Sequence, residues 1–223
     1  MKRKTFSLQY MLLTCRLDLV WLPIAFWALF VILAWMLRDE RMGFHVTAAF
    51  FGVALPLISG ILAAYAVLED PALELQFATP RPAWWMLLER LGMILVLAAG
   101  CALAYQLALA ALKIDLAPLG TFWTRQLAWL APTLAMTAFG SAAAFAGRQS
   151  LAGAAAVGMV WIFEILMREW FLQDRWARYL LLLMGSNYPD HPALRGNQAS
   201  LIGHAAILLV AAWALLRRQE RYI

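Results

Sequence analysis

Residues 46–68 read VTAAFFGVALPLISGILAAYAVL, a run of 23 residues without a single charged side chain. An α-helix rises about 1.5 Å per residue, so this run is long enough to cross the roughly 30 Å hydrocarbon core of a bilayer. Lipid offers no water to the backbone N–H and C=O groups, and a helix satisfies them within one segment. The stretch therefore predicts a membrane-spanning helix.

The rest of the chain has the same character. Its 223 residues are 64% hydrophobic and 14% charged, whereas an ordinary soluble domain is about half apolar and a quarter charged. Further apolar runs cover residues 19–37, 91–112, 126–147, 149–167 and 196–216, and one charged residue, Glu164, interrupts the run 149–167. No alternating barrel pattern is present. We therefore expect an all-α polytopic membrane protein, with six transmembrane helices in one transmembrane domain over residues 1–223.

The positions of the basic residues predict the orientation. Both ends of the chain are basic, with Lys2, Arg3, Lys4 and Arg16 before the first run and Arg217, Arg218 and Arg221 after the last. Cytoplasmic flanks of membrane helices carry an excess of Lys and Arg. An even number of spans places both termini in the cytoplasm. Much of the net charge of +5 lies where topology alone would put it, so no nucleic-acid partner is predicted.

Short connections and flanking segments refine this architecture. Residues 1–18 are expected to form an interfacial helix or, alternatively, a cytoplasmic extension of the first span. The fourth and fifth predicted spans meet through only residues 148–150, so they should be adjacent and antiparallel, with small residues for close approach at Ala142, Ala146, Ala154 and Gly158. Residues 168–195 are rich in aromatic residues and contain an apolar stretch too short to cross. They predict an outer helical hairpin that re-enters the membrane.

The segment after the second run is polar and rich in proline. Residues 69–90 read EDPALELQFATPRPAWWMLLER. Asp70-Pro71 is a strong helix start, and Pro80 with Pro82 ends the helix. Leu73 and Phe77 share one face at i, i+4, which predicts a short amphipathic cytoplasmic helix within 69–82. Its apolar pair either meets a partner protein or packs on its own bundle or on lipid headgroups, and the pattern leaves both interpretations open.

The residues of this loop carry a resemblance. An acidic pair, a Leu-Glu-Leu sequence, a Pro-x-Pro pair and a basic residue lie between the second and third of six spans. The matching positions are Glu69, Asp70, Leu73, Glu74, Leu75, Pro80, Pro82 and Arg90. This order resembles the permease subunits of type 2 ABC transporters, whose coupling helix at this place seats in a groove of the ATPase subunit. Many members carry Gly-Thr or Gly-Ser after the acidic pair, where this chain has Pro71-Ala72.

The resemblance implies a function and a set of partners. It implies an ATP-driven exporter in a prokaryotic cytoplasmic membrane, in which residues 1–18 act as the connecting helix. The chain has no G-x-x-x-x-G-K-[ST] loop, so ATP and Mg would bind to a separate ABC ATPase, and this chain would not itself be an enzyme. A second copy or a sister permease would complete the complex. The implied ATPase-contact residues are Glu69, Asp70, Leu73, Glu74, Phe77 and Arg81.

Some polar residues lie within or beside the predicted spans. Glu164 and Arg168 stand at i, i+4, either lining an outer gate or, as we favour, forming an ion pair that anchors the hairpin. Tyr105 and Gln106 either line a path or bond to neighbouring helices. The histidines show no spacing typical of metal ligands, so no metal site is predicted.

Three other functions are weighed against the exporter. A haem-exporter-like subunit of cytochrome c maturation is a relative of similar length within the same family. A secondary transporter would more typically show inverted repeats and broken helices. An intramembrane enzyme would need a motif such as G-x-S-x-G or H-E-x-x-H, and the sequence contains neither.

Overall fold

The computed structural model describes residues 18–38, 42–66, 68–69 and 83–217, and every regular element in these ranges is helical. The elements in chain order are α2 (Asp18–Met36), α3 (Met42–Ala49), the π-helical turn η1 (Phe50–Ala54), α4 (Leu55–Tyr65), α6 (Ala83–Ala111), η2 (Ala117–Leu119), α7 (Phe122–Gly147), α8 (Ser150–Gln173), η3 (Ala177–Tyr179), α9 (Met184–Asn187) and α10 (Leu194–Leu216). The all-α class is therefore confirmed. The predicted interfacial helix lies outside the described residues, except that Asp18 begins α2.

Five helical segments are long and apolar enough to cross a membrane. They are Gly43–Tyr65, Trp84–Ala111, Phe122–Gly147, Ser150–Gln173 and Leu194–Leu216. The first joins α3, η1 and α4 into one continuous segment and matches the run that begins at residue 46. The remaining predicted span, residues 19–37, corresponds to α2, whose apolar part, Trp21–Met36, is shorter than the other five segments. The chain thus has the architecture of a helical membrane protein, and the crossing of the membrane by residues 19–37 remains a prediction.

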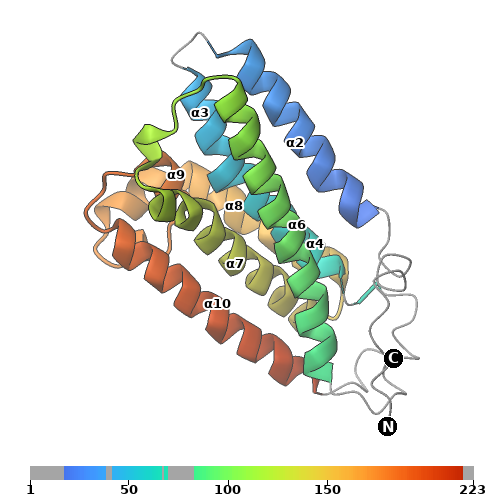
Figure 1. The fold of residues 1–223 in the computed structure, drawn as a ribbon. Helices are drawn as coiled ribbons and strands as arrows, with labels where there is room; N and C mark the ends of the chain where they lie inside the picture. Colours follow the sequence, from blue (N-terminus) through green and yellow to red (C-terminus); the bar gives the residue numbers. More distant parts are fainter. Residues whose placement is uncertain (1–17, 39–41, 67, 70–82, 218–223) are drawn as a thin grey trace.

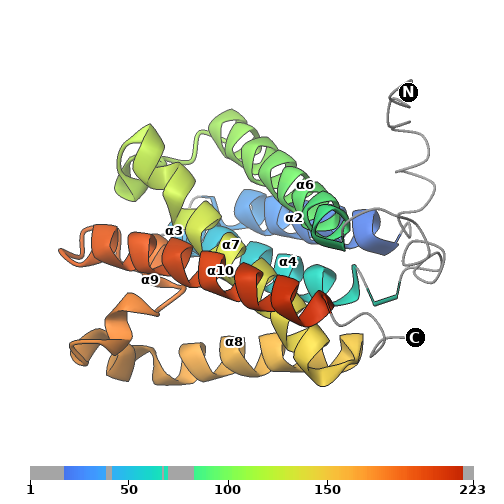
Figure 2. The same cartoon turned by 90° about the horizontal axis from the view of Figure 1, so that it is seen from below.

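Helix α7 lies at the centre of the bundle (Figure 1). Helices α4 and α10 pack along it, α8 packs on both α7 and α4, and α2 packs on α6 and α3. The long helices alternate in direction, so the ends of α4, α7 and α10 gather with the starts of α6 and α8 (Figures 1 and 2). We call this the Glu69 end. The opposite end, where residues 174–193 connect α8 to α10, is the hairpin end.

Two glycines set the crossing of α4 and α7. A Cβ placed on Gly140 would lie 2.1 Å from the carbonyl oxygen of Gly60, and a Cβ on Gly60 would lie 3.0 Å from the carbonyl oxygen of Met136. Only glycine allows two helix backbones to approach this closely. The crossing brings the segment Gly43–Tyr65 into the middle of the bundle.

A tight turn folds α8 back onto α7. Arg148 adopts a left-handed conformation with φ 56°, and the amides of Arg148 and Gln149 both bond to the carbonyl oxygen of Ala144. Such a left-handed residue ends many helices. The predicted adjacency of these two helices is confirmed. Among the glycines of α8, however, Gly153 makes the close contact, where a Cβ would lie 2.7 Å from the Cβ of Ala144, whereas at Gly158 a Cβ would meet open space.

Candidate functional site

The structure describes only one of the six predicted ATPase-contact residues. Glu69 follows the end of α4, and its amide bonds to the carbonyl oxygen of Tyr65 at 3.3 Å. The other five, Asp70, Leu73, Glu74, Phe77 and Arg81, lie outside the described residues. The amphipathic helix within 69–82 therefore stays a prediction.

Glu69 connects the start of this loop to another part of the bundle. Its carboxylate accepts a hydrogen bond from the hydroxyl group of Ser150, the first residue of α8. A negative charge at a helix N-terminus is favourable, because the first amides of the helix have no partner within it. The loop and the α7–α8 turn are thus joined side by side at the Glu69 end, although 81 positions separate the two residues in the sequence.

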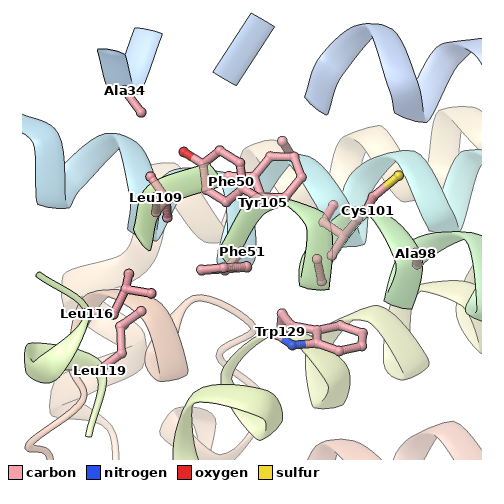
Figure 3. Packing of buried hydrophobic residues seen from close by; sticks show 13 residues of the cluster. Ala34, Phe50, Phe51, Ala98, Cys101, Tyr105, Leu109, Leu116, Leu119 and Trp129 are labelled. Carbon is pink, nitrogen blue, oxygen red and sulfur yellow. The ribbon is translucent and has the colours of Figure 1, made fainter. Parts of the chain in front are cut away.

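Aromatic residues cluster around the π-helical turn η1. Phe50 and Phe51 are consecutive and both fully buried, and their ring centroids lie 4.1 and 5.5 Å from that of Tyr105 on α6. Trp129 of α7 belongs to the same cluster (Figure 3). Tyr105 is therefore a core residue, and its hydroxyl lies 3.5 Å from the carbonyl oxygen of Phe30. Single π turns within helices are frequent at functional sites.

Gln106 forms hydrogen bonds to a neighbouring helix, which is one of the two roles that the sequence left open for it. Its amide and that of Gln126 on α7 exchange hydrogen bonds of 3.2 and 2.9 Å. The indole N–H of Trp129 donates to the same Gln126 oxygen at 2.9 Å. These bonds satisfy polar groups between α6 and α7 and tie the polar pair to the aromatic cluster.

The short helix α9 is wedged against the π turn. Ser186 of α9 is fully buried, and a Cβ on Gly52 of η1 would lie 1.9 Å from its hydroxyl oxygen. On the other side of α9, a Cβ on Gly185 would lie 2.9 Å from Cα of Ala128 on α7. Residues 181–186 are all buried. The predicted hairpin therefore packs into the bundle at this end, while its depth in a membrane remains a prediction.

Glu164 anchors the hairpin, but by a different bond from the predicted one. Its side chain is only 5% exposed, and its Oε2 accepts from the backbone N–H of Leu182 at 2.8 Å. Arg168 instead pairs with Glu169, with 3.3 Å between Nε and Oε1, and its side chain is 53% exposed. The Glu164–Arg168 ion pair is therefore corrected. The buried amide of Leu182 needs an acceptor, whereas the long arginine side chain reaches the surface.

Asn197, which the sequence reasoning did not single out, holds the hairpin from α10. It is almost fully buried, and its Nδ2 donates to the carbonyl oxygens of Arg178 at 2.8 Å and Leu181 at 2.9 Å. Residues 178–182 are thus fixed from two helices, by Glu164 on one side and Asn197 on the other. An asparagine in the first turn of a predicted span was the available signal, because such a residue needs a hydrogen-bond partner in the membrane.

Substitutions at Glu164 should distinguish an anchor from a charged gate. Glu164→Gln keeps an oxygen that can accept from Leu182, so we expect near-normal stability. Glu164→Leu leaves the buried N–H unpaired and should lower the free energy of unfolding by about 1–3 kcal/mol. Detergent-induced unfolding followed by circular dichroism measures both. If Glu164→Gln destabilises as much as Glu164→Leu, the charge itself is required and the anchor interpretation is wrong.

Comparison of the chain with protein-family models, curated proteins and solved structures finds no match.

Proposed function

We propose that this chain is the transmembrane permease subunit of an ATP-driven ABC exporter, and that a separate ATPase drives it through the loop 69–82. The observation that supports this most is the bond between the Glu69 carboxylate and the Ser150 hydroxyl. It ties the loop that carries the family-like motif to the turn between α7 and α8. The five long apolar segments are also what a permease requires.

Force on the loop has three routes into the bundle. It reaches α4 through Glu69, α6 through Ala83, and α8 through the Glu69–Ser150 bond. Helices α4 and α8 both pack on α7. Closure of an ATPase pair around ATP supplies the differential binding energy that favours one bundle conformation over another. The loop therefore acts as a lever on the central helix through both α4 and α8.

The hairpin end would be the outer gate in this proposal. Opening it requires α9 to leave its seat between η1 and α7, because Gly52 and Gly185 make close contacts there. Glu164 and Asn197 would then act as tethers that guide residues 178–182. A second permease, identical or sister, would supply the other wall of the path.

Purification of a tagged copy from its native membrane tests the proposal. An ABC ATPase should co-purify, and the double variant Leu73→Asp/Phe77→Asp should lower its yield roughly a hundredfold, since it places two unpaired charges in the contact. The matched control is Ala72→Asp/Ala78→Asp, which adds the same charge off the Leu73–Phe77 face and should retain the ATPase. The proposal would be contradicted if Leu73→Asp/Phe77→Asp left the yield of ATPase unchanged. It would also be contradicted if the control lost the ATPase to the same extent.

A secondary transporter is the second candidate. Glu164 is a buried carboxylate within α8, and the continuous helical segment Gly43–Tyr65 contains the π turn η1. Intramembrane acidic residues occur in ion-coupled transporters, and π turns are frequent at functional sites. In that case no ATPase would co-purify, and substrate movement would follow an ion gradient without nucleotide.

A further inference from the structure

The turn that follows α8 at the hairpin end has a fixed shape. The Oδ1 atom of Asp174 accepts from the backbone N–H groups of Ala177 at 2.7 Å and Trp176 at 2.8 Å. These two bonds hold the pKa of the Asp174 carboxyl below its usual value, with a smaller contribution from the charge of Arg178. The carboxylate is therefore ionised at neutral pH and keeps residues 174–179 folded as one turn.

Two arginines are arranged on this turn beside aromatic rings. The guanidinium carbon of Arg175 lies 5.7 Å from the ring centroid of Trp176, and that of Arg178 lies 5.7 Å from the ring centroid of Tyr179. Arg178 Nε also donates to the carbonyl oxygen of Arg175 at 3.1 Å. Stacking and this hydrogen bond restrict both side chains before any ligand arrives, which lowers the entropic cost of binding.

The charges around the turn leave these two arginines available. Residues 168–179 contain three arginines and two acidic residues. Glu169 pairs with Arg168, and Asp174 is engaged by the backbone of the turn. Within residues 83–217, neither Arg175 nor Arg178 forms a direct ion pair with a carboxylate. Their forked N–H groups are suited to bidentate contacts with a phosphate.

Exposed tryptophans lie next to the arginines. Trp176 is 74% exposed and Trp170 is 54% exposed. Trp170 lies in the last turn of α8 and Trp176 just after that helix, and Figure 2 shows the end of α8 at the hairpin end. Tryptophan is enriched at the boundary between acyl chains and headgroups, and arginine extends from that level toward the phosphates. The turn therefore combines the two residue types that meet a lipid headgroup.

We propose that the 174–179 turn binds the phosphodiester group of an anionic phospholipid. Arg175 and Arg178 donate to the phosphate oxygens, and Trp176 lies at the acyl boundary. A zwitterionic headgroup would bring its ammonium group onto the two guanidiniums, so an anionic headgroup fits better. This site is independent of the exporter proposal, since neither the loop 69–82 nor an ATPase takes part.

Lipid selectivity of the reconstituted full chain tests the site. Electron spin resonance compares spin-labelled phosphatidylglycerol with spin-labelled phosphatidylcholine in bilayers that contain the protein. The chain should prefer phosphatidylglycerol, and Arg175→Gln/Arg178→Gln should reduce that preference by about fivefold per arginine. Arg175→Lys/Arg178→Lys keeps the charge without the fork and should give an intermediate value. Circular dichroism and gel filtration must match the unsubstituted chain, so that a fold defect is recognised.

Arg168→Gln is the control for the substitutions Arg175→Gln and Arg178→Gln. It removes the same charge from the same end of the bundle, but from an arginine that Glu169 already engages, so the preference should stay within about twofold. A preference that survives Arg175→Gln/Arg178→Gln, or an equal loss in Arg168→Gln, would overturn the proposal. Loss of the preference when inorganic phosphate replaces chloride at constant ionic strength would also overturn it, because the site would then take free anions.

Discussion

Gly140→Ala is expected to force α4 away from α7 and to destabilise the whole bundle. The new Cβ would lie 2.1 Å from the carbonyl oxygen and 2.9 Å from the carbonyl carbon of Gly60. These are backbone atoms of a helix, so no change of rotamer can relieve the contact. Overpacking in a core costs about 1–3 kcal/mol and occasionally more, and we expect Gly140→Ala at or above the upper limit.

Two other glycines provide matched controls for Gly140→Ala. A Cβ on Gly100 of α6 or Gly158 of α8 would meet nothing within 4 Å. Alanine there should be neutral or stabilise the helix by up to about 1 kcal/mol, because it is the better helix former. Unfolding is measured by alkylation of the buried Cys101 as the concentration of a denaturing detergent is raised. Cys15 is replaced by serine, so that only Cys101 reacts. Equal stability of Gly140→Ala and Gly158→Ala would show that the helices do not cross at Gly60.

Gly52→Ala should displace α9 from the bundle while leaving most of the other helices in place. The added Cβ would lie 1.9 Å from the Oγ and 2.7 Å from the Cβ of Ser186. Ser186 is fully buried, and a change of its rotamer would move the Oγ but not the Cβ, so we expect a loss of about 1–3 kcal/mol. The hairpin should then open more often, and trypsin should cleave faster after Arg175 and Arg178.

A compensating change at Ser186 tests the cause of this effect. Ser186→Gly removes both of the atoms closest to the new Cβ, so Gly52→Ala/Ser186→Gly should recover most of the stability and the resistance to trypsin. Ser186→Ala keeps the Cβ and should rescue only in part. If the effects of Gly52→Ala and Ser186→Gly simply add, the two residues are not in contact.

The length of uncharged sequence was enough to predict the helical class and five long helices. Each membrane helix satisfies its own backbone, so its existence depends on local composition alone. The helix boundaries were predicted less accurately. Helix α6 begins at Ala83, eight residues before the uncharged run at 91, because Glu89 and Arg90 interrupt the apolar run without disfavouring a helix. Arg90 is itself buried in the bundle.

The partners of the polar side chains could not be predicted in the same way. Helical spacing paired Glu164 with Arg168, but Glu164 bonds to an amide 18 residues further along the chain. The two hydrogen bonds from Asn197 to the hairpin could be identified only from the tertiary structure.

Local sequence thus determined that this chain forms apolar helices and, through the short connection at residues 148–149, that α7 and α8 lie together. The tertiary structure alone decided that Gly60 meets Gly140, that Gly153 rather than Gly158 meets α7, and that Gly52 receives Ser186. Helical periodicity specifies which residues share a face. Which face meets which depends on the packing of all the helices at once, and small residues mark where close approach is possible without specifying which of them, such as Gly153 or Gly158, meets a neighbouring helix.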